Sequence, residues 1–85
     1  RGGRAAALAE MAEDDVARFE QLRAVRKRLA DAESVPAYIV FSDAVLREMA
    51  MRRPASEAEM LEVPGVGPAK LQRYGEAFLE ALREG

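Results

Sequence analysis

Residues 35–50 read VPAYIVFSDAVLREMA, and no other stretch of the chain constrains the fold as strongly. The run from Tyr38 to Phe41 has the β-branched and aromatic composition of a strand. No second segment offers such a strand a partner, and an unpaired strand leaves its backbone hydrogen bonds unmade. We therefore predict a buried irregular connection or one short helical turn at this point, and no β-sheet.

A long amphipathic helix is expected on the amino-terminal side of this stretch. Its apolar residues recur mostly every three or four positions, the period of an α-helix; they are Leu8, Met11, Val16, Phe19, Leu22, Val25 and Leu29. Pro36 requires an end near Ser34, because proline disfavours helical geometry in the residue before it. Asp14 and Asp15 are possible caps for a start at that point. The alanine-rich residues before them favour one continuous helix over about 5–32, which we predict.

A second helix is expected directly after the strand-like run. Ser42 is a favourable N-cap for it, and Asp43 stands in its first turn, where an anion is stabilised. The pair Arg52 and Arg53 before Pro54 marks its end. Its apolar face is formed by Val45, Leu46, Met49 and Ala50.

Two more helices follow. Ser56 and Glu59 have the spacing of a capping box, which would open a short helix with Met60 and Leu61 facing the core. Pro68 opens the last helix, at a position where its missing N–H costs no hydrogen bond. The buried stripe of that helix is Leu71, Tyr74, Phe78, Leu79 and Leu82. The predicted fold class is all-α, a compact bundle of about five helices.

Residues 60–75, MLEVPGVGPAKLQRYG, contain the pattern of a helix-hairpin-helix turn. Gly65 and Gly67 allow positive φ, and Val66 between them would fill the gap between the two helices. In proteins that bind DNA through such a turn, free N–H groups at the start of the second helix meet a phosphate. Lys70 and Arg73, one turn apart, would extend that site. A turn that only packs two helices is the favoured interpretation, because proline removes a donor and nearby glutamates repel phosphate.

The composition excludes several classes of function. The chain has no cysteine and no histidine, so disulfides, thiolate metal sites and the commonest general base are absent. No apolar run approaches the length of a membrane span, and no signal-peptide pattern is present. We expect a cytoplasmic domain with no catalytic residues, cofactor or metal site. The start, Arg1-Gly2-Gly3, looks like a linker end or a cut from a longer chain.

The charges are segregated along a chain whose net charge is −2. Residues 16–30 hold one acidic residue, Glu20, and five basic ones: Arg18, Arg23, Arg26, Lys27 and Arg28. Residues 54–85 hold six acidic and three basic residues. A basic helix face fits contact with phosphates, although a solvated helix face is the simpler alternative.

Stretches 35–50 and 60–75, in this order after a basic amphipathic helix, resemble the HRDC (helicase and RNase D C-terminal) family. The likeness runs from about Asp15 to the end, so we expect an HRDC-like domain over 15–85, with a linker or N-terminal helical extension over 1–14. The resemblance implies an accessory domain of five helices that binds single-stranded or partial-duplex DNA weakly. A bacterial RecQ-type DNA helicase is the favoured parent, ahead of an RNase D-type nuclease.

The resemblance also points to Tyr38, since an aromatic residue after this proline has been linked to DNA contact in helicase HRDC domains. A tyrosine can stack on an unpaired base of any sequence. It could equally pack inward beside Ile39 and Phe41. The candidate DNA contacts are Tyr38, Arg23, Arg26, Lys27, Arg47, Lys70 and Arg73.

The acidic carboxy-terminal half supports a second hypothesis, an interdomain or protein–protein regulatory module. Glu57, Glu59 and Glu62 fall within one short helix and would form an acidic patch. Such a patch would dock on a basic surface, including one on another domain of the parent helicase, or screen the domain from DNA. As an isolated domain we expect a monomer, associated with the nucleoid through its parent.

Overall fold

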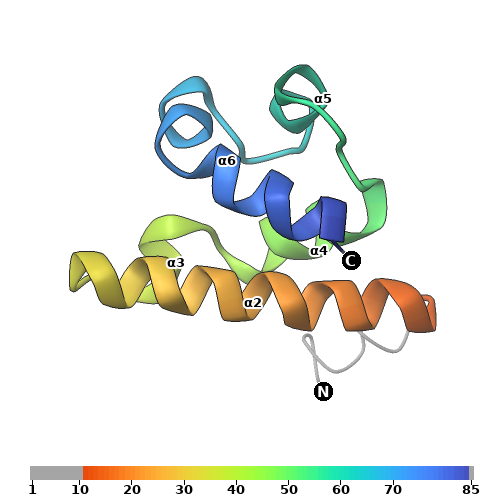
Figure 1. Ribbon diagram of the computed structural model, residues 1–85, viewed down its shortest axis with the longest axis horizontal. Coiled ribbons are helices and arrows are strands. Elements are labelled where there is room, and N and C mark those ends of the chain that lie inside the picture. The colour runs from red at the N-terminus through yellow and green to blue at the C-terminus, as the bar shows by residue number, and fades with distance from the viewer. Residues whose placement is uncertain (1–10, 85) are drawn as a thin grey trace.

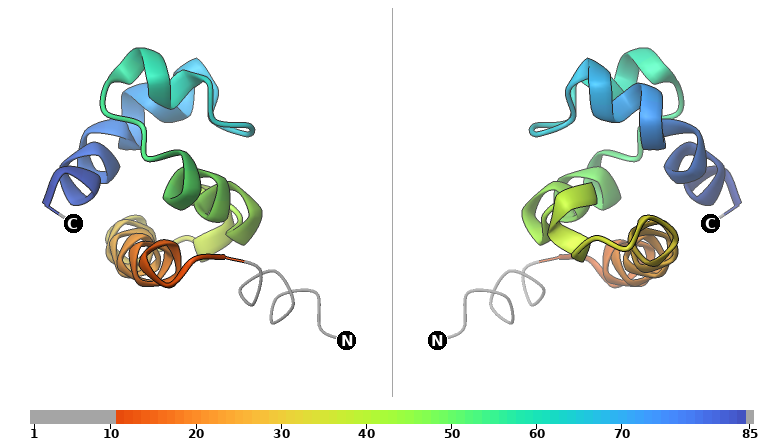
Figure 2. Two further views of the ribbon diagram at one scale, coloured as in Figure 1. Left: turned by 90° about the vertical axis from the view of Figure 1, so that its right-hand side faces the viewer. Right: turned by 90° about the vertical axis from the view of Figure 1, so that its left-hand side faces the viewer.

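The structure, a computed structural model, describes residues 11–84, which form five helices and no strand (Figure 1). They are α2 (Glu13–Glu33), α3 (Ala37–Val40), α4 (Asp43–Arg52), α5 (Glu57–Leu61) and α6 (Pro68–Glu84). The long helix α2 contacts α3, α4 and α6, and α5 packs on α6. Figure 2, which looks along α2, shows α4 and α6 side by side above it. The predicted all-α bundle is confirmed.

The first helix begins later than we predicted. Ala12 has an extended backbone, with φ −63° and ψ 156°, so α2 starts at Glu13 and a continuous helix through this point is wrong. Residues 5–10 lie outside the described residues. No side chain caps α2; Asp14 and Asp15 instead occupy its first turn, where carboxylates are stabilised by the helix dipole.

The strand-like run forms a short helical turn, one of the two predicted outcomes. In α3 the side chain of Val40 is buried, and so is that of Phe41, which follows the helix. The predicted N-cap of α4 is also confirmed, because the Ser42 hydroxyl accepts a hydrogen bond from the Val45 N–H at 3.3 Å. The backbone therefore stays paired without a strand partner.

The capping box of α5 closes differently from the expected pattern. The Ser56 hydroxyl accepts from the Glu59 N–H at 3.2 Å, as predicted, but the Glu59 carboxylate accepts from the Ala55 N–H at 2.8 Å instead of the Ser56 N–H. Met60 is buried, whereas Leu61 is 44% exposed. Our prediction that both face the core is wrong for Leu61, since neighbouring residues on a helix point about 100° apart and α5 packs mainly on α6.

One apolar core fills the space between α2 and the helices above it. Phe41 contacts two aromatic rings of α6 edge-on, with centroid distances of 5.3 Å to Phe78 and 6.1 Å to Tyr74. Such pairs are stabilised beyond the area that they bury. The largest fully buried side chains are Phe19, Leu22, Val40, Leu46, Met49, Met60, Val63 and Phe78. No helix among the described residues is both long and apolar enough to cross a membrane.

The hairpin between α5 and α6 depends on one of its two glycines. Gly65 has φ +93°, and a Cβ atom added there would collide with the side chain of Val45 on α4. Gly67 has no such conformation, and a Cβ atom there would meet nothing within 4 Å. Val66 is buried between them, as predicted. Positive φ was expected at either glycine, and it occurs at Gly65.

We predict that Gly65→Ala destabilises the fold by more than about 1 kcal/mol, because alanine is strained at positive φ and must displace Val45. Gly67→Ala is the matched control and should change the unfolding free energy by less than about 0.5 kcal/mol. Urea unfolding followed by circular dichroism measures both values. Equal stabilities of the two variants would contradict this account of the turn.

Candidate nucleic-acid interface

Tyr38 projects from α3 into solvent, and 68% of it is exposed. Successive residues on a helix are about 100° apart, so Val40, which is fully buried, points to the opposite side from Tyr38. The alternative that Tyr38 packs inward is wrong. Ala37 and Ile39 flank it, one on each side of α3. The ring is therefore available on the crest of the helix.

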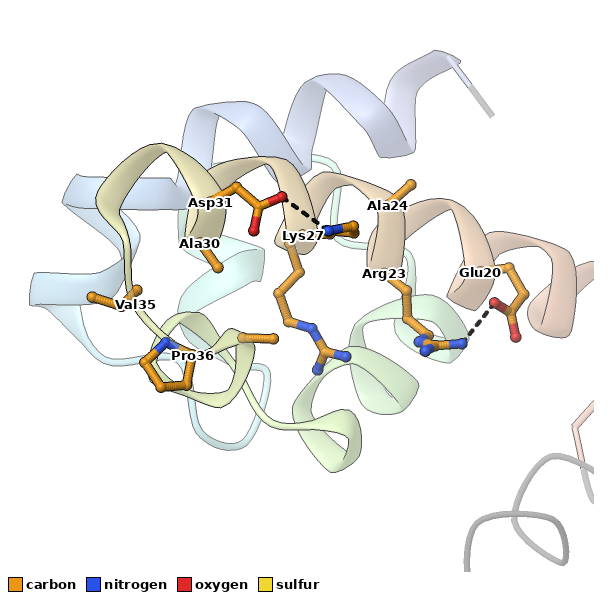
Figure 3. A pocket seen from close by; sticks show the side chains of 10 residues that line it. Glu20, Arg23, Ala24, Lys27, Ala30, Asp31, Val35 and Pro36 are labelled. Atoms are coloured by element: carbon orange, nitrogen blue, oxygen red, sulfur yellow. Dashed lines mark hydrogen bonds and ion pairs between the residues drawn. The ribbon is translucent and has the colours of Figure 1, made fainter.

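A groove lies on each side of this crest. The groove between α2 and α3 has a volume of about 580 Å³, and its lining includes Arg23, Lys27 and Ala37 (Figure 3). The groove between α3 and α6 has a volume of about 280 Å³, and its lining includes Ile39 and Arg73. Val35 borders both grooves. We call them the α2–α3 groove and the α3–α6 groove.

Half-buried Arg23 and exposed Lys27, both on α2, line the α2–α3 groove, and each is paired within its own helix. Arg23 forms an ion pair with Glu20 at 3.0 Å, and Lys27 forms one with Asp31 at 2.9 Å (Figure 3). Ion pairs between exposed side chains of one helix stabilise by a few tenths of a kcal/mol. Both cations can therefore exchange a carboxylate for a phosphate at little cost.

Arg26 was expected at the DNA surface, and the structure corrects this. Its side chain is only 10% exposed and forms an ion pair with Asp43 at 2.8 Å. It also donates a hydrogen bond to the Phe41 carbonyl at 3.0 Å. The guanidinium thus joins α2 to the backbone between α3 and α4. Sequence period alone placed it among solvated cations, because its partners, Asp43 and the Phe41 carbonyl, lie outside α2.

Lys70 and Arg73 contact other elements of the fold and do not converge on the hairpin turn. The Lys70 ammonium donates to the carbonyls of Ile39 at 2.6 Å and Val40 at 3.0 Å. Arg73 forms an ion pair with Glu33 at the end of α2, with an N–O distance of 3.1 Å. The two cations therefore contact different elements and do not form one phosphate site at the turn.

Arg47 lies along the contact between α2 and α4. These helices run antiparallel, since Arg26 pairs with Asp43 at the start of α4 while Arg18 donates to the Ala50 carbonyl near its end, at 3.1 Å. Arg47 is one turn beyond Asp43 and is half-buried. Within residues 11–84 it forms no ion pair. It does not line the α2–α3 groove.

Glu33 is a member of the site region that sequence reasoning missed. Its carboxylate accepts from the Tyr74 hydroxyl at 2.8 Å and from the Arg73 guanidinium at 3.1 Å. The Tyr74 bond, followed by the Arg73 bond, lowers the pKa of Glu33. The bond to Glu33, followed by burial, raises the pKa of Tyr74. No local pattern reveals this network, because it joins residues 33 and 74 across two helices.

The acidic residues of α5 lie away from the basic groove. Glu57, Glu59 and Glu62 are all exposed, and α5 sits across α6 from α2 (Figure 1). Glu57 and Glu76 share a groove of about 230 Å³ between α5 and α6. No three carboxylates within residues 11–84 are grouped as a metal ion would require. The acidic patch and the basic groove are thus separate surfaces.

Comparison with known proteins assigns this fold to a family. The sequence profile of the HRDC domain matches residues 15–82, so the chain belongs to the HRDC family. In solved structures it is similar to HRDC domain 3 of RecQ from D. radiodurans, with a TM-score of 0.80 and 36% identity, over 82% of this chain and 92% of that one.

The curated relatives are much longer DNA helicases. The chain is 50% identical over 66 residues to the ATP-dependent DNA helicase RecQ of Haemophilus influenzae, covering 78% of this chain and 11% of the relative. It is 47% identical to RecQ of Pasteurella multocida, covering 78% and 10%. It is 38% identical to the ATP-dependent DNA helicase UvrD2 of Mycobacterium tuberculosis, covering 74% and 9%. The chain thus spans about a tenth of the length of these relatives.

We predict that Glu33→Gln makes the stability of the domain less dependent on pH in acid. The lowered pKa of Glu33 means that its ionised form stabilises the fold above the unfolded pKa, and that this contribution is lost as the pH falls through the folded pKa. Thermal melts between pH 7 and pH 3 measure the effect. The control is Glu62→Gln, an exposed glutamate. Parallel pH profiles for the wild type and Glu33→Gln would contradict the prediction.

Proposed function

We propose that this chain is a non-catalytic accessory domain of a RecQ-type DNA helicase that binds single-stranded DNA weakly. The observation that carries the proposal is Tyr38, an aromatic ring 68% exposed beside a groove lined by Arg23 and Lys27. A large aromatic side chain held in solvent by a fully buried neighbour offers a flat surface for an unpaired base. Its chemistry is that of a stacking platform next to phosphate ligands.

In this proposal one base stacks on Tyr38 and the adjoining phosphates lie in the α2–α3 groove. Arg23 and Lys27 exchange Glu20 and Asp31 for phosphate oxygens, and Arg47 adds a further positive charge. None of these contacts reads base identity, so binding is independent of sequence. The domain would then modulate how the parent helicase engages a strand.

Binding should be weak, because phosphates must compete with carboxylates for the cations of the groove. Each cation of α2 that lines it is already paired with a carboxylate, and the net charge of the chain is −2. Most of the binding free energy would then come from counterion release by a few phosphates. A small number of contacts also makes the affinity sensitive to salt.

We predict that the chain binds a labelled oligo-dT strand at low salt, and that the affinity falls about tenfold or more between low and physiological salt. Tyr38→Ala should weaken binding at low salt by about 1–3 kcal/mol, the range for loss of one stacked base. Its melting temperature should stay near the wild-type value because the ring is exposed. Fluorescence anisotropy and thermal melts measure both quantities.

Tyr38→Phe is the matched control, because it keeps the stacking ring and should bind nearly as well as the wild type. Tight binding that persists at high salt would contradict the electrostatic part of the proposal. A loss of about 3 kcal/mol of stability in Tyr38→Ala would place the ring in the core and contradict the stacking part.

A second candidate function is an interdomain or protein–protein contact through α5. It is favoured by the exposure of Leu61 beside Glu57 and Glu62, and by the acidic groove that Glu57 shares with Glu76. An apolar side chain within an acidic rim suits a partner whose basic surface surrounds an apolar spot. This surface is separate from Tyr38, so both functions can coexist.

We predict that the double variant Glu57→Lys/Glu62→Lys keeps its fold and alters DNA affinity. Tighter DNA binding by the isolated chain would mean that the glutamates repel phosphate. A change seen only in the full-length parent would indicate docking on another domain. The control is Glu80→Lys/Glu84→Lys, the same charge change on α6. If neither context differs from the control at low salt, the patch is ordinary solvated surface.

A further inference from the structure

The helix that presents Tyr38 is too short to be stable on its own. The helix α3 has four residues, and an isolated helix of one turn does not form in water. The last carbonyl groups of any helix lack partners within it. In α3 these carbonyls follow Tyr38 directly, so whatever holds them also holds the ring.

Cationic side chains satisfy three consecutive carbonyls after Tyr38. Lys70 donates to the carbonyls of Ile39 and Val40, at 2.6 and 3.0 Å. Arg26 donates to the next carbonyl, that of Phe41, at 3.0 Å. A cation at the carboxy-terminal end of a helix is stabilised by the helix dipole as well as by its hydrogen bonds. Two of the three Lys70 donors are therefore engaged with α3.

Lys70 also contacts the residue that anchors α3 to the core. Its ammonium lies 5.6 Å from the centroid of the Phe41 ring, and Phe41 packs against two aromatic rings of α6. Lys70 is the third residue of α6, three positions after Gly67. The hairpin turn therefore sets where Lys70 stands, and the tight packing of Gly65 on Val45 fixes that turn against α4.

We infer that Lys70 is a positioning residue for DNA binding, which holds α3 so that Tyr38 presents its ring, and is not a ligand of phosphate. The effect of Lys70 on DNA binding rests on the proposed function. Its role in ordering α3 does not. It also gives the hairpin motif a role: the turn delivers a lysine to the carboxy-terminal end of α3.

Lys70→Met tests the inference, because methionine keeps much of the apolar stem and removes the ammonium group. We expect the backbone order parameter of Tyr38 from ¹⁵N relaxation to fall from about 0.85 towards about 0.6, the values of rigid and flexible backbone. The amide of Leu46, which bonds to the Ser42 carbonyl at 3.1 Å, is the internal control and should not change. Lys70→Arg should restore order at Tyr38, since arginine can donate to the same carbonyls.

The DNA arm compares Lys70→Met with Lys27→Met, a proposed phosphate contact. Lys27→Met should lower the slope of log affinity against log salt by about 0.7, the value for one phosphate of a single strand. Lys70→Met should weaken oligo-dT binding by about three- to tenfold and leave that slope unchanged. The double variant Lys70→Met/Tyr38→Ala should bind no more than about twofold more weakly than Tyr38→Ala, because both changes remove the same stacking contact.

The outcomes separate this inference from the proposed function. If the wild type fails to bind oligo-dT at low salt, the proposed function fails, and the order parameter of Tyr38 still decides whether Lys70 holds α3. An unchanged order parameter in Lys70→Met overturns the inference. So does a salt slope reduced as in Lys27→Met, which would make Lys70 a phosphate ligand. Should Lys70→Met unfold, Lys70→Leu, which also keeps an apolar stem and donates no hydrogen bond, is measured in the same two arms.

Discussion

The burial of Phe41 connects the core of this domain to its candidate interface. The ring packs against Tyr74 and Phe78 of α6, its carbonyl accepts from Arg26 of α2, and the Lys70 ammonium lies near its face. A residue held from two helices at once cannot move without disturbing both. The adjoining turn α3 is short and would not form alone, so its shape depends on this anchor.

Polar contacts between helices complement a small apolar core. A domain of this size buries a limited fraction of its surface, so each additional tertiary contact is a considerable part of its stability. Five such contacts join α2 to α4 or α6: Arg18 to the Ala50 carbonyl, Gln21 to the Ala81 carbonyl, Arg26 to Asp43, and Glu33 to both Arg73 and Tyr74. They span the length of α2 and fix the directions of α4 and α6 relative to it.

The same contacts explain why the basic helix is not a uniform basic surface. Arg26 is used inside the fold, whereas Arg23 and Lys27 are paired with carboxylates on the exposed side of α2. The cations that remain exchangeable line the α2–α3 groove, which Ala37, the residue before Tyr38, also lines. The acidic residues of α5 lie across α6 from α2 (Figure 1). The basic and acidic residues, which are separate in the sequence, therefore also lie on separate surfaces, the α2–α3 groove and the acidic patch of α5.

Local patterns were sufficient for the helices and most of their ends. Ser42, Ser56 and Pro68 mark helix starts through hydrogen bonds, or a missing donor, within a few residues, and Gly65 marks a turn through its own backbone freedom. These signals can be read from the sequence because the interacting groups are only a few residues apart in the chain. The start of α2 at Glu13 and the exposure of Leu61 could not be predicted from local patterns. Where a helix begins, and which of its apolar side chains is buried, depends on what packs against it. The internal roles of Arg26, Lys70 and Glu33 depend on partners 15 to 41 positions away. Those partners meet only when α2, α3 and α6 come together.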